Sequence, residues 1–522
     1  MTLTSARSTP AGTDSLRIDV TGGTVQGVVR HGLRMWRGIP FAAPPIGPLR
    51  LRKPFPVVPW TGVRDASEFG DVPMQDRKGQ FIGVDGKSSM SEDCLTVNVI
   101  APLTASEALR PVMVWIYGGA YSAGSGRQMN LQGEGLARDG DLIFVNFNYR
   151  LGAFGYLDFT RFSTPDRPIE SNLGPRDQVA ALEWVRDNIA AFGGDPDNVT
   201  LFGESAGGNA VITLMTVPSA RGLFARAIAQ SPPPDAVYDR SLTTVWAQDY
   251  VELLSSVVDD YSTESTSPED AAELLLNAGA EDLVLATTTM QRLTPDRVPG
   301  TVPLCPVIDG EFLPERPIDA FDNGRAHPVP LIIGTNDREG SLFTGRLDIL
   351  ASTPSRIRAI FAKTKKKARK RLKLLYPGLP AKRPAADFAG DYSFWYPSIR
   401  VAERHADFAP VHMYRFDLAP RLLRWIGLDA THGIELFAVF DRAKGPLGRG
   451  IGVFGGYRAF AKTGERMRAN WLRFARYGTV DPAWPLYTAR KRNTLVIDET
   501  DRVESDPRRE KRLAWQEFVP HV

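Results

Sequence analysis

Short apolar runs alternate with helix-patterned segments along most of the chain. The clearest apolar runs cover residues 111–117, 142–147, 199–202 and 330–334, and glycine or proline punctuates them. Runs this short and this apolar are typical of strands that are covered on both faces. The chain contains no repeat of fixed period. We therefore predict an α/β fold with a large mixed, mostly parallel sheet flanked by helices.

Two longer segments have a helical pattern without strong strand-like runs. The first covers about residues 232–303 and the second about residues 345–405. We expect both to be helical insertions over the sheet of one domain, residues 16–522. Residues 1–15 mix small, polar and charged side chains without an apolar stretch, so we expect a disordered lead-in and no signal peptide.

Composition and charge narrow the class of protein. The 522 residues are 43% hydrophobic and 24% charged, which is typical of a soluble globular protein with a large core. The 63 basic and 60 acidic residues leave a net charge of only +3, so nucleic acid is not a favoured partner. No apolar run approaches the length that spans a bilayer. We expect a cytoplasmic protein without an integral membrane segment.

Only two cysteines are present, Cys94 and Cys305, and they lie far apart in the sequence. Two such cysteines cannot form the disulfide framework of a small secreted domain. Cys94 lies in a strand-like run, where packing in the core is the usual role of a thiol. We expect both thiols to be reduced and buried.

One block of positive charge stands out within a helical stretch from Arg356 to Leu375. Its basic residues are Lys363, Lys365, Lys366, Lys367, Arg369, Lys370, Arg371 and Lys373. Such a block could bind an anionic lipid surface or a nucleic acid. Blocks of like charge are commonly exposed, and no aromatic and basic stripe elsewhere extends this one into a groove. We favour a solvated helix face over an anionic contact.

The segment from Gly203 to Gly207 contains the pattern Gly-x-Ser-x-Gly, which occurs once. Its flanks strengthen this modest signal, because an apolar run ends directly at Gly203 and a helix-patterned run starts at Gly208. A tight strand-to-helix turn lifts its serine above the sheet edge and needs small neighbours. Ser205 is therefore a candidate nucleophile, and the N–H of Ala206 is a candidate donor to an oxyanion.

A second set of donors follows the apolar run at residues 111–117. Gly118 and Gly119 come directly after it, and Ala120 follows. Small residues at the end of a strand allow backbone N–H groups to approach a developing negative charge closely. Gly119 and Ala120 are therefore candidate oxyanion donors, although a pair of glycines after a strand is also a common turn.

A serine hydroxyl needs a neutral imidazole to remove its proton. In α/β-hydrolases the chain order is serine, acid, histidine, which removes His31. The remaining histidines are His327, His405, His412, His432 and His521. His327 precedes a proline and leads into a strand-like run, and His405 lies in a helical run. His412 lies in a strand-like run, and His521 lies at the chain end. His432 stands in a loop, so it is the favoured base.

The loop after residues 330–334 offers two carboxylates, Asp337 and Glu339. Either would hold the imidazole by its other nitrogen and stabilise the cation that forms when the serine loses its proton. An ordinary surface carboxylate is the alternative for both. Spacing alone does not choose between them.

Further signatures extend beyond the segment around Ser205. They are Arg37-Gly38-Ile39-Pro40-Phe41-Ala42, Glu92-Asp93-Cys94-Leu95, the run from Asn148 to Gly155, the run from Phe192 to Gly208, and Trp484-Pro485-Leu486-Tyr487. Together they resemble the type-B carboxylesterase family, which includes cholinesterases, animal carboxylesterases and bacterial para-nitrobenzyl esterases. The likeness covers about residues 16–518. It implies an α/β-hydrolase fold and a serine enzyme that hydrolyses small to medium carboxylic esters through an acyl-enzyme, without a metal or cofactor.

The resemblance also implies a role for each site residue. It assigns the acid to Glu339, the base to His432, the oxyanion donors to Gly119, Ala120 and Ala206, and support of the acid to Ser231. Aromatic side chains that line an apolar pocket would include Tyr121, Phe394 and Trp395, for which core packing is the alternative. The chain departs from the family at the acid, where Arg338 replaces an aspartate and Asp337 replaces a basic residue.

Two other classes of function compete with ester hydrolysis. The first is a non-catalytic cholinesterase-like binding module, but such modules have lost the nucleophile, whereas Ser205, Glu339 and His432 all stand in place. The second is a serine peptidase of related fold, which usually places its nucleophile late in the chain. More than half of this chain follows Ser205. We therefore favour ester hydrolysis.

Overall fold

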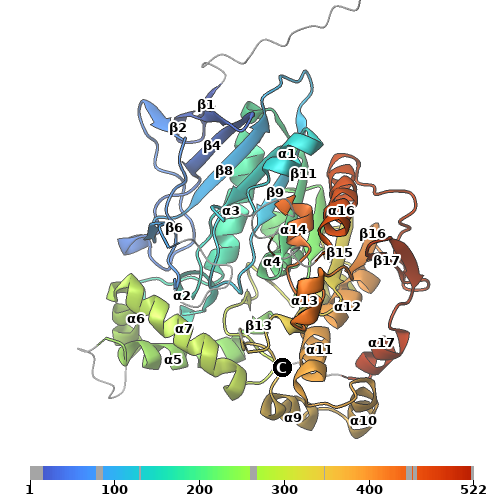
Figure 1. Cartoon of the computed structure of the whole chain (residues 1–522). Coiled ribbons are helices and arrows are strands. Elements are labelled where there is room, and N and C mark those ends of the chain that lie inside the picture. Colours follow the sequence, from blue (N-terminus) through green and yellow to red (C-terminus); the bar gives the residue numbers. More distant parts are fainter. Residues whose placement is uncertain are drawn as a thin grey trace, which may run out of the picture.

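The computed structural model describes residues 16–518 apart from residues 78–85, 129–130, 259–266, 346, 443–449 and 451–454. The predicted lead-in, residues 1–15, lies outside the described residues. Figure 1 shows one large twisted sheet with helices packed around it.

Within the described residues, the large sheet has 11 strands in the order β18-β17-β16-β15-β12-β11-β9-β10-β8-β4-β3. Their bounds are β3 Val28–Arg30, β4 Leu33–Pro40, β8 Thr96–Pro102, β9 Arg110–Ile116, β10 Ile143–Phe147, β11 Gly194–Glu204, β12 Arg226–Gln230, β15 Leu331–Asn336, β16 Val411–Phe416, β17 Asn493–Ile497 and β18 Arg502–Ser505. Neighbouring strands run parallel from β17 through to β10, and the outer pairs run antiparallel. The sheet is thus mixed and mostly parallel, as predicted.

Smaller strands and helices complete the fold. The short strands are β1 Arg17–Val20, β2 Gly23–Gln26, β5 Val63–Asp65, β6 Val72–Pro73, β7 Met90–Ser91, β13 Tyr238–Asp239 and β14 Val307–Ile308. The helices are α1 Glu134–Gly140, α2 Ala153–Tyr156, α3 Leu173–Asn188, α4 Ala206–Leu214, α5 Arg240–Ser255, α6 Pro268–Asn277, α7 Ala280–Arg297, α8 Pro317–Asp322, α9 Pro354–Ala362, α10 Lys366–Leu375, α11 Lys382–Gly390, α12 Tyr396–His405, α13 Arg421–Trp425, α14 Leu436–Val439, α16 Tyr457–Tyr477 and α17 Arg509–Gln516. Shorter helical turns are η2 Gly47–Leu49, η3 Thr160–Phe162, η4 Ile189–Phe192, η5 Pro218–Ala220, η6 Glu339–Ser341 and η7 Asp391–Trp395.

The apolar runs become the interior of the sheet. Every residue of β9, β10, β15 and β16 is buried, which explains why these runs are apolar without alternation. Each of the four predicted runs lies on a strand, and β11 begins already at Gly194. Cys94 and Cys305 are both free and buried, as predicted.

The two segments with a helical pattern lie together below the large sheet in the view of Figure 1, with α5, α6 and α7 on one side and α9, α10 and α11 on the other. The predicted helical stretch from Arg356 to Leu375 lies on two helices, α9 and α10, with a break between them. In this break the hydroxyl of Thr364 donates to the carbonyl of Ile360, a local bond that competes with continuation of the helix.

The parallel strands bring the candidate residues to one edge of the sheet. Ser205 follows β11, Glu339 follows β15, and Gly119 follows β9, so all three stand at carboxyl ends of parallel strands. Such ends share one edge of the sheet, where ligand sites of α/β proteins usually form. Among the described residues, no helix has both the length and the apolar character needed to cross a membrane.

Candidate active site

Ser205 lies at the sharp turn between β11 and α4. Its backbone φ is 59°, a left-handed value that strains a serine and persists only where the surroundings hold it. A Cβ on Gly203 would lie 2.4 Å from the carbonyl oxygen of Gly207, and one on Gly207 would lie 2.1 Å from that of Ile116. Both positions therefore require glycine, which explains the spacing of the pattern.

Gly119, Ala120 and Ala206 line the same cavity as Ser205. Gly119 has a φ of 125°, and a Cβ there would lie 2.1 Å from the carbonyl oxygen of Ala123, so the turn needs glycine. Within the described part of the chain, no group accepts a hydrogen bond from the backbone N–H of Gly119 or Ala120. Ala206 begins α4, where a backbone N–H has no partner inside the helix. All three residues thus bring backbone N–H groups to the cavity that Ser205 lines.

His432 and Glu339 are in direct contact, and both side chains are buried. Nδ1 of His432 lies 2.5 Å from Oε2 of Glu339. Since an ionised carboxylate can only accept, Nδ1 carries the proton and Nε2 of the neutral imidazole is the basic nitrogen. Nε2 has no hydrogen-bond partner among the described residues. His432 and Ser205 line one cavity.

The other oxygen of Glu339 is held by two donors. Oε1 accepts hydrogen bonds from the hydroxyl of Ser231 at 2.7 Å and from the backbone N–H of Asn336 at 2.6 Å. Asp337, the other carboxylate of this loop, forms an ion pair with Arg508. The geometry therefore places Glu339, and not Asp337, against the imidazole.

Two buried glutamates that we did not single out from the sequence also lie beside the site. Oε1 of Glu204 is 3.2 Å from Nε2 of His432, without the geometry of a hydrogen bond. Glu435 accepts a hydrogen bond of 2.6 Å from the side-chain amide of Asn336. Glu204 directly precedes Ser205, and Glu435 lies three residues after His432. These positions in the sequence could have identified both residues as neighbours of the site. In the described part of the chain, no three or more His, Cys, Asp or Glu side chains are arranged to hold a metal ion.

The carboxylates and the imidazole shift one another's proton affinity. Burial raises the pKa of Glu204 to about 8 and the pKa of Glu435 to about 7, because their charged forms lose water and face other carboxylates. Burial lowers the pKa of His432, but the carboxylates of Glu204 and Glu339 raise it by more. The net pKa of His432 therefore lies above its usual value of 6.5.

A cavity of about 220 Å³ opens beside Ser205 and His432. Phe343 and Phe394 line it next to the base, with ring centres 5.1 and 4.7 Å from that of the imidazole. These two rings stack on each other at 5.7 Å and belong to a small apolar cluster around them. Phe343, which we had not singled out, and Phe394 thus form an apolar wall beside the imidazole of His432.

The other aromatic candidates have different surroundings. Tyr121 lines the cavity, but its hydroxyl donates to the side chain of Asn209 at 2.7 Å. Trp395 is not among the residues that line the cavity, and its ring centre lies 5.6 Å from the guanidinium carbon of Arg508. Of the histidines that compete with His432, His327, His405 and His412 do not line the cavity. His521 lies outside the described residues.

Residues 14–515 match the carboxylesterase family. The para-nitrobenzyl esterase of Bacillus subtilis (strain 168) is 35% identical over 502 residues, which cover 94% of this chain and 96% of that protein. The phenmedipham hydrolase of Pseudarthrobacter oxydans is 33% identical over 509 residues, which cover 93% and 96%. A solved PNB esterase has a TM-score of 0.83 at 33% identity and covers 97% of this chain and 100% of its own.

Proposed function

The chain belongs to the carboxylesterase family and is a serine ester hydrolase with the α/β-hydrolase fold, and on this premise we propose that Ser205, His432 and Glu339 are its catalytic triad. The observation that carries the proposal is the contact between Glu339 and His432 at the cavity that Ser205 also lines. These residues come from three loops at one edge of the sheet.

The reaction proceeds in two halves through an acyl-enzyme. Oγ of Ser205 attacks the ester carbonyl carbon while its proton passes to Nε2 of His432, and the carbonyl electron pair moves to the oxygen. Collapse of this intermediate breaks the bond to the alcohol oxygen, which leaves with the proton from His432. A water molecule then repeats the attack with His432 as base, and it releases the carboxylic acid and Ser205.

Two sets of groups stabilise the charges that develop. The N–H groups of Gly119, Ala120 and Ala206 receive the oxyanion, and one such donor is typically worth about 10²–10³ in rate. Glu339 holds the imidazole in the tautomer that accepts at Nε2, and it stabilises the imidazolium that forms. Ser231 holds Glu339 in place from the other side.

The cavity supports small to medium esters with an apolar group as substrates. Its volume of about 220 Å³ and the wall of Phe343 and Phe394 favour burial of an apolar acyl or alcohol group beside the serine. Two relatives are named for para-nitrobenzyl esters and for phenmedipham, which are aromatic compounds. Aromatic esters with short acyl chains are therefore the substrates to test first.

Hydrolysis of para-nitrophenyl acetate and butyrate by the purified protein tests the triad. We expect the wild type to release para-nitrophenol and Ser205→Ala to lose at least about 10⁴-fold in kcat, because the variant has no nucleophile. No turnover by the wild type would favour a non-catalytic binding module instead. Equal turnover by wild type and Ser205→Ala would mean that another residue reacts.

We also propose that the protein works in the cytoplasm as one catalytic domain covering residues 16–522. The free, buried thiols of Cys94 and Cys305 support a reducing compartment. Continuity of the large sheet, which takes strands from β3 near the start of the described chain to β18 near its end, supports a single domain. Fractionation of cells by centrifugation would test the compartment.

A further inference from the structure

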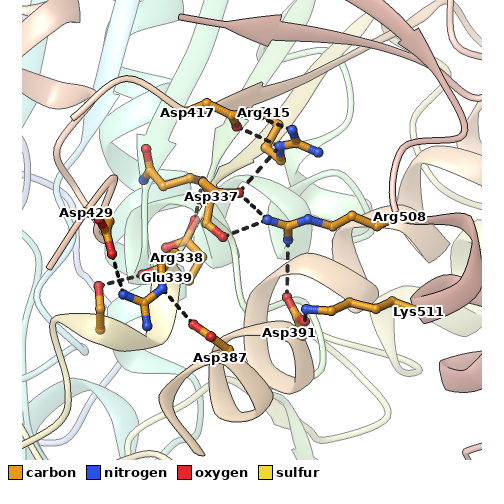
Figure 2. A network of polar contacts seen from close by, with 12 residues as sticks. Asp337, Arg338, Glu339, Asp387, Asp391, Arg415, Asp417, Asp429, Arg508 and Lys511 are labelled. Atoms are coloured by element: carbon orange, nitrogen blue, oxygen red, sulfur yellow. Dashed lines mark hydrogen bonds and ion pairs between the residues drawn. The ribbon is translucent and has the colours of Figure 1, made fainter. Parts of the chain in front are cut away.

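A network of charged side chains surrounds the turn that carries Glu339, and Figure 2 shows it. Several of its members line a second, polar cavity of about 160 Å³. Asp337 and Arg338, the two positions where the chain departs from the family pattern, bind different partners in this network. Asp337 pairs with Arg508 and lies 3.8 Å from Arg415, whereas Arg338 turns toward a different set of acids.

The guanidinium of Arg338 is buried, with 8% of the side chain exposed, and has three acceptors. Nε donates to Oδ1 of Asp387 at 2.8 Å. Nη1 donates to Oδ2 of Asp429 at 2.6 Å and to the carbonyl of Gly427 at 3.1 Å. Burial lowers the pKa of Arg338, but the two carboxylates raise it by more, so the side chain stays charged.

The acid and the base of the triad stand on two separate loops. The acid loop, residues 336–341, carries Glu339, and the base loop, residues 427–433, carries His432. Their contact of 2.5 Å therefore depends on how the two loops are held relative to each other.

Arg338 joins these two loops with both its backbone and its side chain. Its N–H donates to the carbonyl of Ala430 at 3.0 Å, and it forms an isolated parallel bridge with Thr431. Its guanidinium adds the bonds to Gly427 and Asp429. The contacts of one residue thus run along the base loop up to the position before His432.

Among the described residues, Arg338 forms no hydrogen bond or ion pair with the carboxylate of Glu339. The bonds of Glu339 go to Ser231, to the backbone of Asn336 and to His432. An effect of Arg338 on the reaction therefore runs through the groups that it binds, and Gly427, Asp429 and Ala430 among them belong to the base loop.

We propose that Arg338 is a positioning residue that holds the base loop against the acid loop through Asp429, so that His432 stays in contact with Glu339. The proposal rests on the proposed function of these last two residues. Proton transfer needs the base within hydrogen-bond reach, so a small displacement of the base loop lowers the rate of the chemical steps. Binding of the ester relies on the cavity wall and changes less.

Arg338→Met tests this role because it keeps the length of the side chain and removes its charge and donors. We expect kcat, normalised to active sites by the burst of para-nitrophenol, to fall at least about tenfold while KM stays within about twofold. Arg338→Lys keeps the charge, but its ammonium cannot serve all three acceptors at once, so we expect it to restore part of the loss.

Arg512 provides a matched control. Its side chain is also buried, with 6% exposed, and it donates two bonds to Asp506 at 2.8 and 2.7 Å. It lies on α17 and lines neither of the two cavities. We expect Arg512→Met to lower the melting temperature as Arg338→Met does, but to keep kcat within about twofold of the wild type.

A double variant tests whether the route runs through Asp429. Asp429→Asn is suitable because asparagine, like aspartate, tolerates the φ of 53° at this position. Oδ2 of Asp429 also accepts a hydrogen bond of 2.9 Å from Arg383, so Asp429→Asn is measured alone as well. If Arg338 and Asp429 act through one contact, the kcat of the double variant, Arg338→Met with Asp429→Asn, lies within about twofold of that of the slower single variant. Losses that multiply would overturn the proposal, as would a kcat of Arg338→Met within about twofold of the wild type, or an equal loss in Arg512→Met. Absence of hydrolysis by the wild type is a separate result, which would overturn the proposed function itself.

Discussion

Three buried glutamates surround the imidazole of His432, and their charges decide at which pH it acts as a base. Glu339 holds Nδ1, Glu204 lies 3.2 Å from Nε2, and Glu435 is linked to the acid through Asn336 and Ser231. Burial favours the neutral forms of Glu204 and Glu435, so part of this negative charge is removed near neutral pH. The residues directly around the base therefore act as one coupled group.

The pH profile of kcat/KM should reflect this coupling. His432 acts as base only when neutral, and its pKa is raised, so activity rises with pH through a midpoint above 6.5. Glu204→Gln removes the nearest carboxylate from Nε2, so we expect the midpoint to move to lower pH. Rates of para-nitrophenyl butyrate hydrolysis from about pH 5 to about pH 9 measure both curves. A midpoint that stays in place or moves upward in the variant would contradict this role of Glu204.

Close packing between helices, turns and strands holds the site residues in position. The turn η6, which carries Glu339, packs on α11, and α4 packs on β9, β11 and β12 behind Ser205. The predicted strands were confirmed because their apolar runs are a local signal of burial on both faces. The sequence pattern did not predict the break between α9 and α10, where the hydroxyl of Thr364 donates to the carbonyl of Ile360.

Gly340 is the point where the acid turn meets α11 most closely. A Cβ on Gly340 would lie 1.9 Å from the carbonyl oxygen of Ala386, so the turn and the helix must separate in Gly340→Ala. We expect a loss of about 1–3 kcal/mol in the free energy of unfolding, measured by urea denaturation, together with a lower kcat. Gly86→Ala is the control, because nothing lies within 4 Å of a Cβ there, and it should change stability by less than about 0.5 kcal/mol. Equal stability of both variants would show that η6 yields without strain.

The basic stretch from Lys363 to Lys373 lies on and directly before α10, at the surface of the molecule. Its lysines are exposed, and Leu372 faces inward. Two of its cations face acids on α17 or directly after it: Arg371 lies 3.5 Å from Glu510 and 3.1 Å from Glu517, and Lys367 lies 3.7 Å from Glu517. These neighbouring acids reduce the positive field of the stretch, which supports a solvated surface.

Sedimentation with lipid vesicles tests this surface. A basic surface gains about 1 kcal/mol per cation near anionic lipid, but screening within about 8 Å at physiological salt weakens that gain. We expect the protein to stay in the supernatant with phosphatidylserine vesicles at physiological salt, as it does with purely zwitterionic vesicles. Salt-sensitive pelleting of most of the protein with the anionic vesicles alone would contradict this prediction and show a lipid-binding surface.

The sequence by itself determined the class of fold, the family and the segments that carry the chemistry. Strand periodicity and the glycines around Ser205 depend on near neighbours in the chain, so they are readable without a structure. By residue type and chain order alone, the acid stayed open between Asp337 and Glu339.

Only the tertiary structure decided which side chains face one another. It placed Glu339 against His432 and turned Arg338 toward Asp429, although some 90 residues separate each pair in the chain. It also left Trp395 out of the cavity lining. The physical reason is that the direction of a side chain at a loop or buried face is set by the ion pairs and packing that distant segments supply, and no local pattern encodes those contacts.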